Sequence, residues 1–330
     1  MSPFTYTRAD DPNAAVSGIA ANAKARFLGG GTNLIDLMKM GVEAPTQLID
    51  INRLPLTQIE DLNGGVRIGG LARNAEAAEH PLIVQRYPVL SQAILAGASA
   101  QLRNMATTGG NLLQRTRCYY FYDPAFPMCN KRNPGSGCGA LNGFNRIHAI
   151  FGQSEQCIAT NPSDMSVALA ALEAVVRVQS AKGERQIAIG DFHRLPGTTP
   201  NVDTNLQADE LITAVDLPAM PFAVRSSYLK MRDRASYAFA LVSVAAVLDL
   251  TPDRKINGAR IALGGVAHKP WRATQAEQQL VGKTADENAF RAAAETALNG
   301  AKAYKHNAFK IELAKRSIVR ALTTTAAIPV

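Results

Sequence analysis

The sequence lacks the segments that would insert the protein into a membrane or export it. No window of its 330 residues reaches the roughly 18 uninterrupted apolar residues of a membrane span. Residues 1–10 also lack the apolar core and small-residue cleavage site of a signal peptide. We therefore expect no membrane span and no export signal in this chain, so export would need a partner that carries a signal.

Concentrated positive charge is absent as well, although the formal net charge is +8. The Lys and Arg residues are spread along the chain, without the basic runs and interleaved aromatic residues that are typical of nucleic-acid binding. There is no low-complexity tract and no internal repeat. We expect no nucleic-acid partner and a globular protein long enough for two domains.

Familiar catalytic patterns are missing too. The sequence has no Ser-His-Asp order, no HExxH and no nucleophile elbow, and its five histidines are scattered. Isolated histidines of this kind are usually structural or lie on the surface. We therefore predict a chain that holds cofactors and has no catalytic residue of its own.

Cysteine is rare, and all four cysteines lie within one 40-residue stretch: Cys118, Cys129, Cys138 and Cys157. Thiolates are soft, reactive ligands, and the Pro- and Gly-rich loop between them needs an organising centre. The spacings lack the Cys-x2-Cys knuckles of structural zinc and the tight runs of bacterial ferredoxins. From the residues alone, an iron–sulfur cluster, a zinc ion, disulfides and free thiols all stay open.

Basic residues surround these cysteines, namely Arg115, Arg117, Lys131, Arg132 and Arg146, against the single acid Asp123. We expect a locally cationic region that offsets the negative charge of a thiolate-bound cluster. A solvated or partner-facing basic surface is the alternative.

Two glycine-rich runs are present in the first third of the chain. The run Gly29-Gly30-Gly31-Thr32-Asn33 follows a predicted strand at 26–28 and precedes a predicted helix at 34–40. Thr107-Thr108-Gly109-Gly110-Asn111 follows a predicted helix at about 89–100. Neither run is a Rossmann or P-loop motif. As a pair they suit a ligand with two phosphates, whereas either one alone is also consistent with a plain turn before a helix.

The second half predicts an α+β domain that begins after the Pro-bearing stretch 217–221. Ser163 caps a predicted helix at 164–172, and a β-branched strand follows at 175–178. The remaining predictions are strands at 227–231, 241–250 and 259–263 and helices at 271–281, 287–298 and 307–323.

Several runs in chain order resemble a known family. They are the two glycine runs with Leu34, Asn161-Pro162-Ser163-Asp164, Lys230 and the stretch 264–272. Together they resemble the FAD-binding subunit of molybdenum hydroxylases, the xanthine dehydrogenase family. The resemblance implies an α+β protein with a vanillyl-alcohol-oxidase or PCMH-type FAD-binding domain in residues 1–221, built from subdomains of about 1–55 and 56–221. A carbon monoxide dehydrogenase flavoprotein-like C-terminal domain would occupy residues 222–330.

The resemblance also implies which residues bind the FAD. The first run would wrap the pyrophosphate, the second would form another cradle, and four further positions would line the site. The expected contacts are Phe27, Leu28, Gly29, Gly30, Gly31, Thr32, Asn33, Leu34, Gly97, Thr107, Thr108, Gly109, Gly110, Asn111, Asp164, Ile212 and Lys230.

Most relatives lack the four-cysteine insertion, which occupies residues 112–160 here. The insertion, with the runs Arg115-Thr116-Arg117-Cys118 and Pro134-Gly135-Ser136-Gly137-Cys138, is similar to the periplasmic aldehyde oxidoreductase flavin subunits that carry an extra [4Fe–4S] cluster. All four cysteines would then be cluster ligands. A 4-hydroxybenzoyl-CoA reductase-like or xanthine dehydrogenase-like flavin subunit is the alternative, and from another class a nucleotide-binding module with a structural zinc.

The resemblance implies two partner subunits in a heterotrimer, one with [2Fe–2S] clusters and one with the molybdenum cofactor, where an aldehyde is oxidised to a carboxylic acid. Neither the Cys-x4-Cys-x2-Cys pattern nor enough length for the molybdenum domain is present in this chain. We expect the chain to pass electrons from its partners through FAD to an external electron acceptor, in the periplasm if a signal-bearing partner exports it.

Overall fold

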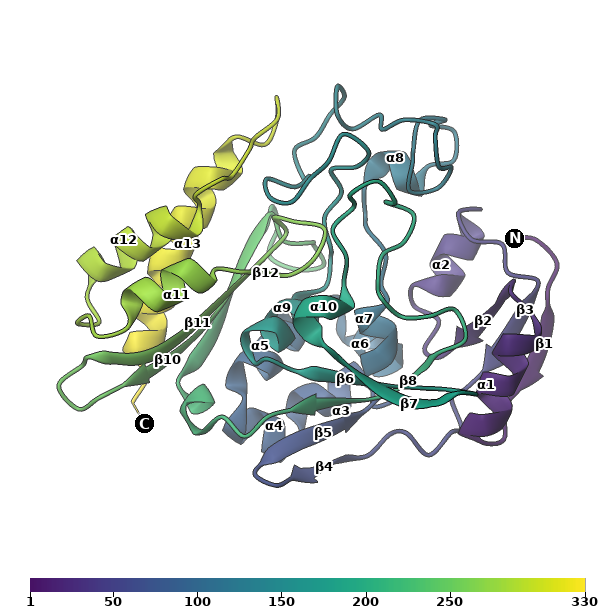
Figure 1. Ribbon diagram of the computed structural model, residues 1–330, viewed down its shortest axis with the longest axis horizontal. Helices are drawn as coiled ribbons and strands as arrows, with labels where there is room; N and C mark the ends of the chain where they lie inside the picture. The colour runs from purple at the N-terminus through teal and green to yellow at the C-terminus, as the bar shows by residue number, and fades with distance from the viewer. Residues whose placement is uncertain (330) are drawn as a thin grey trace.

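The computed structural model describes residues 1–329, which form three β-sheets in succession along the chain (Figure 1). The first sheet is parallel, with strand order β1-β3-β2. Because parallel neighbours need a crossover, a helix separates each strand from the next along the chain. The elements are β1 (Thr5–Arg8), α1 (Pro12–Ala21), β2 (Ala25–Leu28), α2 (Leu34–Lys39) and β3 (Gln47–Asp50).

The second sheet is antiparallel, with strand order β4-β5-β8-β6-β7. Its strands are β4 (Ile59–Leu62), β5 (Gly65–Gly69), β6 (Val175–Ser180), β7 (Gly183–Ala188) and β8 (Leu211–Leu217). Short helices accompany it: α3 (Asn74–Glu79), α4 (Pro81–Arg86), α5 (Pro88–Ala96), α6 (Ala100–Met105), α7 (Thr108–Leu112), α9 (Asp164–Ala171) and α10 (Ile189–Phe192).

The third sheet is antiparallel, in the order β12-β11-β10-β9, and follows a short 3-10 helix, η1 (Pro221–Val224). It lies at the left of Figure 1, beside the yellow C-terminal helices. The elements are β9 (Ser226–Met231), β10 (Val242–Leu250), β11 (Ile256–Gly264), β12 (Trp271–Arg272), α11 (Thr274–Leu280), α12 (Glu287–Ala297) and α13 (Phe309–Ala326).

Strand β10 is buried on both faces, which explains its continuous apolar sequence. Val244 and Ala246 belong to the hydrophobic core of the C-terminal helices, whereas Ala245 and Val247 belong to the core that contains α9. Successive side chains of a strand point to opposite faces, so one strand serves both cores. The third sheet is therefore joined to the core of the second sheet through α9, in which every residue is buried.

The cysteine insertion lies at the top of Figure 1, above the second sheet and between α2 and the C-terminal helices. Its regular structure is limited to the one-turn helix α8 (Tyr119–Tyr122) and two isolated bridges. None of the helices within residues 1–329 has the length and apolar character needed to cross a bilayer.

Most predicted elements are confirmed, and three differ. The helix predicted at 89–100 is broken into α5 and α6 at Gly97-Ala98-Ser99, where Ala98 has a φ of 51°. The helix predicted at 271–281 begins only at Thr274, because Trp271 and Arg272 pair with β11. The second glycine run, predicted as a loop, is the helix α7 with Thr107 as its N-cap.

Candidate cofactor sites

The first glycine run forms the loop between β2 and α2. Within residues 1–329 the backbone N–H groups of residues 29–33 donate to no protein acceptor. The side-chain Nδ2 of Asn33 is also buried without a partner. Because successive free donors form a concave anion site, this loop fits a phosphate-bearing ligand.

Position 30 has no room for any side chain, so only glycine fits there. A Cβ on Gly30 would lie 1.8 Å from the carbonyl oxygen of Met105 and 2.6 Å from its carbonyl carbon. These are backbone atoms, which cannot rotate aside as a flexible side chain does. The absent side chain therefore lets the loop lie directly against the end of α6 and the second run.

The second glycine run lies beside the first. Thr107 Oγ1 accepts a hydrogen bond from Gly110 N at 3.1 Å, and Gly109 N donates to Gly70 O at 2.8 Å. A Cβ on Gly29 would lie 3.1 Å from Thr107 Oγ1. The backbone N–H groups of residues 108–111 thus all donate to the protein itself, whereas those of the first run do not.

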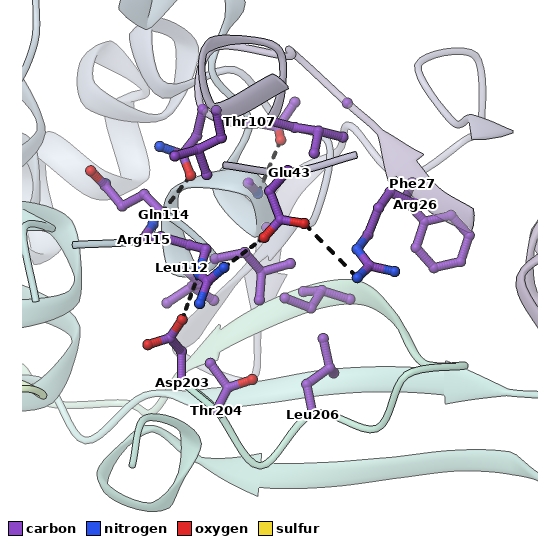
Figure 2. Close-up of a pocket in the computed structure, with 18 of the residues that line it drawn as sticks. Arg26, Phe27, Glu43, Thr107, Leu112, Gln114, Arg115, Asp203, Thr204 and Leu206 are labelled. Carbon is purple, nitrogen blue, oxygen red and sulfur yellow. Dashed lines mark hydrogen bonds and ion pairs between the residues drawn. The ribbon is translucent and has the colours of Figure 1, made fainter. Parts of the chain in front are cut away.

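A cavity of about 600 Å³ lies between the two runs and the segment that precedes β8 (Figure 2). This volume falls in the range of about 300–1,000 Å³ that is typical of cofactor pockets. The predicted FAD contacts that line it are Phe27, Leu28, Gly29, Gly30, Gly31, Thr32, Asn33, Leu34, Thr107, Gly109, Gly110 and Ile212.

Thr108 and Asn111, which were also predicted to contact FAD, do not line this cavity. Thr108 is buried, and its Oγ1 donates to Ala72 O at 3.1 Å. Asn111 Oδ1 accepts a hydrogen bond from Ser163 Oγ at 2.7 Å. Asn111 and Ser163 flank the cysteine insertion, so the two ends of the insertion meet at this contact.

Gly97, Asp164 and Lys230 meet in a second group outside the cavity. Lys230 Nζ lies 2.7 Å from Asp164 Oδ2, and Tyr228 donates to Asp164 Oδ1 at 2.7 Å. A Cβ on Gly97 would lie 3.3 Å from Asp164 Oδ2. Burial raises the pKa of Asp164, and the Lys230 ammonium offsets part of that rise. The structure brings these three predicted residues together but does not join them to the glycine-run cavity.

The four cysteines line one small enclosed cavity, and none forms a disulfide. Cys118, Cys129 and Cys157 are buried, and Cys138 is partly exposed. Burial raises the pKa of Cys118 to about 12 and that of Cys157 to about 11. Across residues 1–329, no three His, Cys, Asp or Glu side chains meet closely enough to hold a single metal ion. The arrangement is thus four neighbouring thiols around a common space.

Two hydrogen bonds point at the sulfur atoms, and a cation stands beside them. His148, which is 1% exposed, places Nε2 3.1 Å from Cys118 Sγ. Ala159 N donates to Cys157 Sγ at 3.5 Å. Lys131 lines the same cavity, and its charge offsets part of the burial effect on the pKa of Cys157. The N–H donor of Ala159 and the positive charge of Lys131 favour the thiolate form that a metal requires.

The basic residues expected to make the cysteine region cationic mostly have acidic partners from elsewhere in the fold. Arg117 pairs with Asp36 at 2.8 Å, and Arg146 pairs with Asp233 at 2.8 Å. Arg132 donates to four carbonyl oxygens within residues 120–126. The fold brings in carboxylates that the local sequence does not reveal and that offset part of this charge, whereas the carbonyl oxygens around Arg132 leave its charge in place.

A series of ion pairs runs from the glycine-run cavity to the cysteine cavity, and Figure 2 shows its first part, in which Arg115 lies between Glu43 and Asp203. Arg115 lies 2.6 Å from Glu43 and 2.8 Å from Asp203 Oδ2. The other oxygen of that carboxylate, Asp203 Oδ1, pairs with Lys131 Nζ. Sequence reasoning missed Glu43 and Asp203 because each is an isolated acid far along the chain from its partners.

Asp203 should make stability depend on pH in the acidic range. Burial alone would raise the pKa of Asp203, but Lys131 and Arg115 lower it from 3.8 to about 2. A carboxylate with a lowered pKa stabilises the folded state above about pH 4, and the contribution is lost as the pH falls towards 2. We expect Asp203→Asn to cost about 2 kcal/mol at neutral pH and to flatten the acid limb of the stability curve.

Urea unfolding of the wild-type and Asp203→Asn proteins between about pH 7 and pH 3 checks this. Parallel stability curves for the two proteins would contradict it.

Comparison with known families decides the assignment. Residues 2–220 match the FAD binding domain in molybdopterin dehydrogenase, which is more than half of the chain. Residues 226–325 match the CO dehydrogenase flavoprotein C-terminal domain. This chain belongs to the molybdopterin dehydrogenase FAD-binding family. The α+β fold and the FAD expected for that family are thereby confirmed.

Individual relatives of this flavoprotein extend over nearly its full length. It is 52% identical over 324 residues to the aldehyde oxidoreductase FAD-binding subunit PaoB of Escherichia coli, covering 98% of both chains. It is 30% identical to the glyceraldehyde dehydrogenase medium chain of Sulfolobus acidocaldarius, covering 85% of this chain and 82% of that one. Among solved structures, carbon monoxide dehydrogenase from Hydrogenophaga pseudoflava matches with a TM-score of 0.75 at 25% identity, covering 98% of this chain and 97% of that one.

Proposed function

We propose that this flavoprotein is the electron-transfer subunit of a heterotrimeric molybdenum-cofactor aldehyde oxidoreductase. The observation that carries the proposal is the 52% identity, over 98% of both chains, to the Escherichia coli aldehyde oxidoreductase subunit. On a partner subunit, an aldehyde and water would give a carboxylic acid, two protons and two electrons. This chain would then carry the electrons through FAD to an external acceptor.

The proposed enzyme has two further subunits besides this chain. The relatives are named as a subunit and as a medium chain, which supports an assembly of several chains. The [2Fe–2S] and molybdenum centres are assigned to these partners because the Escherichia coli relative, which this chain matches over 98% of both chains, is named as an FAD-binding subunit. Purification of the complex followed by assays with a panel of aldehydes and purines would test the substrate class. Turnover of purines alone would favour a xanthine dehydrogenase-like enzyme.

The FAD would rest with its diphosphate on the first glycine run. Free backbone N–H groups at residues 29–33 and the unpartnered Nδ2 of Asn33 suit phosphate oxygens. Bound FAD supplies a carrier that accepts two electrons and releases them singly or in pairs. The chain's own residues bind the diphosphate and shape the cavity.

The cysteines are proposed as the ligands of a [4Fe–4S] cluster. The donor set fits: four thiols from one segment surround a shared cavity, and burial raises the pKa of Cys118, Cys138 and Cys157, so their thiolate forms need a cationic centre among them. A [4Fe–4S] cluster is bound by four cysteine thiolates, and the four cysteines that line this cavity supply that number.

Optical and metal measurements on the purified chain test both cofactors. We expect flavin absorbance together with iron and acid-labile sulfide. A colourless protein that contains stoichiometric zinc would instead support a nucleotide-binding module with a structural metal.

Cys129→Ser should lose the cluster and loosen the insertion. Removing a ligand removes binding energy that is coupled to local folding. We expect the iron content to fall below about half of the wild-type value and proteolysis within residues 112–160 to become faster, while FAD is retained. Full iron content in this variant would contradict the ligand assignment.

We also propose the domain division and the compartment. Residues 1–221, with the insertion at 112–160, would form the FAD-binding domain, and residues 222–330 the C-terminal domain; the two family matches, 2–220 and 226–325, support this division. The complex would be periplasmic, exported with a signal-bearing partner. Activity and this chain should then be recovered together in the periplasmic fraction, and recovery only from the cytosol would contradict export.

A further inference from the structure

One carboxylate stands between the two candidate cofactor sites. Asp203 Oδ2 accepts from Arg115 Nε at 2.8 Å, and Asp203 Oδ1 accepts from Lys131 Nζ. Arg115 and Asp203 both line the glycine-run cavity, and Lys131 lines the cysteine cavity. The side chain of Lys131 is 1% exposed and that of Arg115 is 20% exposed, so water screens this chain of charges weakly.

Both ends of this series of ion pairs are connected to the segments that would bind the two cofactors. The backbone N of Arg115 donates to Asn33 Oδ1 at 3.1 Å, which links Arg115 to the first glycine run. Lys131 is two residues from Cys129 and also donates to Pro200 O at 2.7 Å. The backbone of Asp203 is also held in place, because its carbonyl oxygen accepts a hydrogen bond from Arg194 N at 2.9 Å.

Other charged groups meet this carboxylate as well. Glu43 shares Arg115 with it, and His268 Nε2 lies 3.9 Å from Asp203 Oδ1. Asp203 is a partly buried carboxylate shared between two cations, so weakening its ion pair with one cation strengthens its ion pair with the other.

We propose that Asp203 is a positioning residue that couples FAD binding to the redox potential of the cysteine-bound cluster. The inference rests on the proposed function, because it needs both cofactors. An anionic diphosphate in the glycine-run cavity competes with Asp203 for Arg115. Asp203 then neutralises Lys131 more fully, the positive charge beside the cluster falls, and the cluster becomes harder to reduce.

Coupling between two sites is reciprocal in free energy. FAD therefore binds more tightly when the cluster is oxidised than when it is reduced. We expect a ratio of about tenfold, within the range of about 5- to 150-fold that is usual for coupled sites. For a one-electron couple, tenfold corresponds to a potential difference of about 59 mV.

The test measures the cluster's midpoint potential in the full chain by redox titration monitored with electron paramagnetic resonance, with FAD bound and after FAD removal. In the wild type we expect the cluster's midpoint potential to be about 59 mV lower with FAD bound than after FAD removal. In Asp203→Asn the potential should be higher than in the wild type, because Lys131 loses its counter-charge, and the FAD-dependent difference should shrink to less than half. An unchanged difference in Asp203→Asn would overturn the coupling.

Asp216→Asn is the matched control. Asp216 pairs with Arg67 at 2.7 Å and with Arg177 at 3.0 Å, but it lines neither cavity. This variant should keep the full FAD-dependent difference, and loss of that difference would show that any broken ion pair has the same effect and would overturn the specific role of Asp203.

A second variant keeps the test decisive if Asp203→Asn fails to retain iron. Arg115→Gln breaks the series of ion pairs on the FAD side and leaves the Asp203–Lys131 pair intact. The FAD-dependent difference in the cluster's midpoint potential should therefore also shrink in this variant. An unchanged difference in Arg115→Gln overturns the proposal. Wild-type chain without iron and sulfide would instead refute the proposed function and the coupling with it.

Discussion

Gly30→Ala should release FAD and destabilise the protein. The added Cβ would sit 1.8 Å from Met105 O, so the loop between β2 and α2 must move away from the second glycine run. Overpacking against a well-packed neighbour typically costs about 1–3 kcal/mol, and backbone atoms leave little room for relief. We expect a loss of about 3 kcal/mol in the free energy of unfolding and at least about tenfold weaker FAD binding.

Gly190→Ala provides the control for this experiment. Gly190 lies in α10, its added Cβ would meet no atom within 4 Å, and its φ is not in the left-handed region. Because alanine is favoured over glycine in a helix, this variant should be as stable as the wild type or up to about 1 kcal/mol more stable. FAD absorbance and urea unfolding report both quantities. Full FAD occupancy in Gly30→Ala would show that the close approach of the two runs is not needed for binding.

Lys230→Met should be the other strongly damaging change. Lys230 and Asp164 are almost completely buried, and their 2.7 Å ion pair compensates two charges that have left water. Breaking a buried pair by removing one partner costs about 3–5 kcal/mol, because the other charge is left uncompensated. Without Lys230, Asp164 would take up a proton in the folded state. The penalty should therefore be larger at about pH 8 than at about pH 5.

Two further variants separate this effect from a general loss of lysine. Lys315→Met removes a lysine whose partner, Glu295, is largely exposed, so the cost should stay below about 1 kcal/mol. Adding Asp164→Asn to Lys230→Met removes the stranded charge and should restore more than half of the lost stability. Equal losses in Lys230→Met and Lys315→Met, measured by urea unfolding, would contradict the importance of the buried pair.

Short-range patterns predicted much of this fold. Ser163 was predicted to cap a helix, and its Oγ accepts from Ser166 N at 2.9 Å at the start of α9. The apolar run at 241–250 predicted a buried strand, and β10 spans Val242–Leu250. Both depend on interactions within a few residues or on a simple periodicity, so the sequence contains the information directly.

Features that depend on distant partners were not predictable in this way. Trp271 and Arg272 look helical locally, yet pairing with β11 makes them a strand. Lys131 and Asp203 are 72 residues apart in sequence, and only the folded chain shows that they form an ion pair. The glycine motifs predicted the first cavity, whereas the ionic link from that cavity to the cysteines arises from tertiary structure alone.

The contact between Asn111 and Ser163 has a consequence for the length of the cysteine insertion. Because the side chains at its two ends are joined by a 2.7 Å hydrogen bond, the chain leaves and re-enters the FAD-binding domain at neighbouring points. The entropy of closing a loop rises only slowly with its length, so a long insertion between these points adds little to that cost. Contacts outside the domain fix the insertion: Ile150 belongs to the core of the C-terminal helices, and Lys310 donates to His148 O at 2.9 Å. The insertion therefore bridges the FAD-binding domain and the C-terminal helices, and shortening it would weaken that connection.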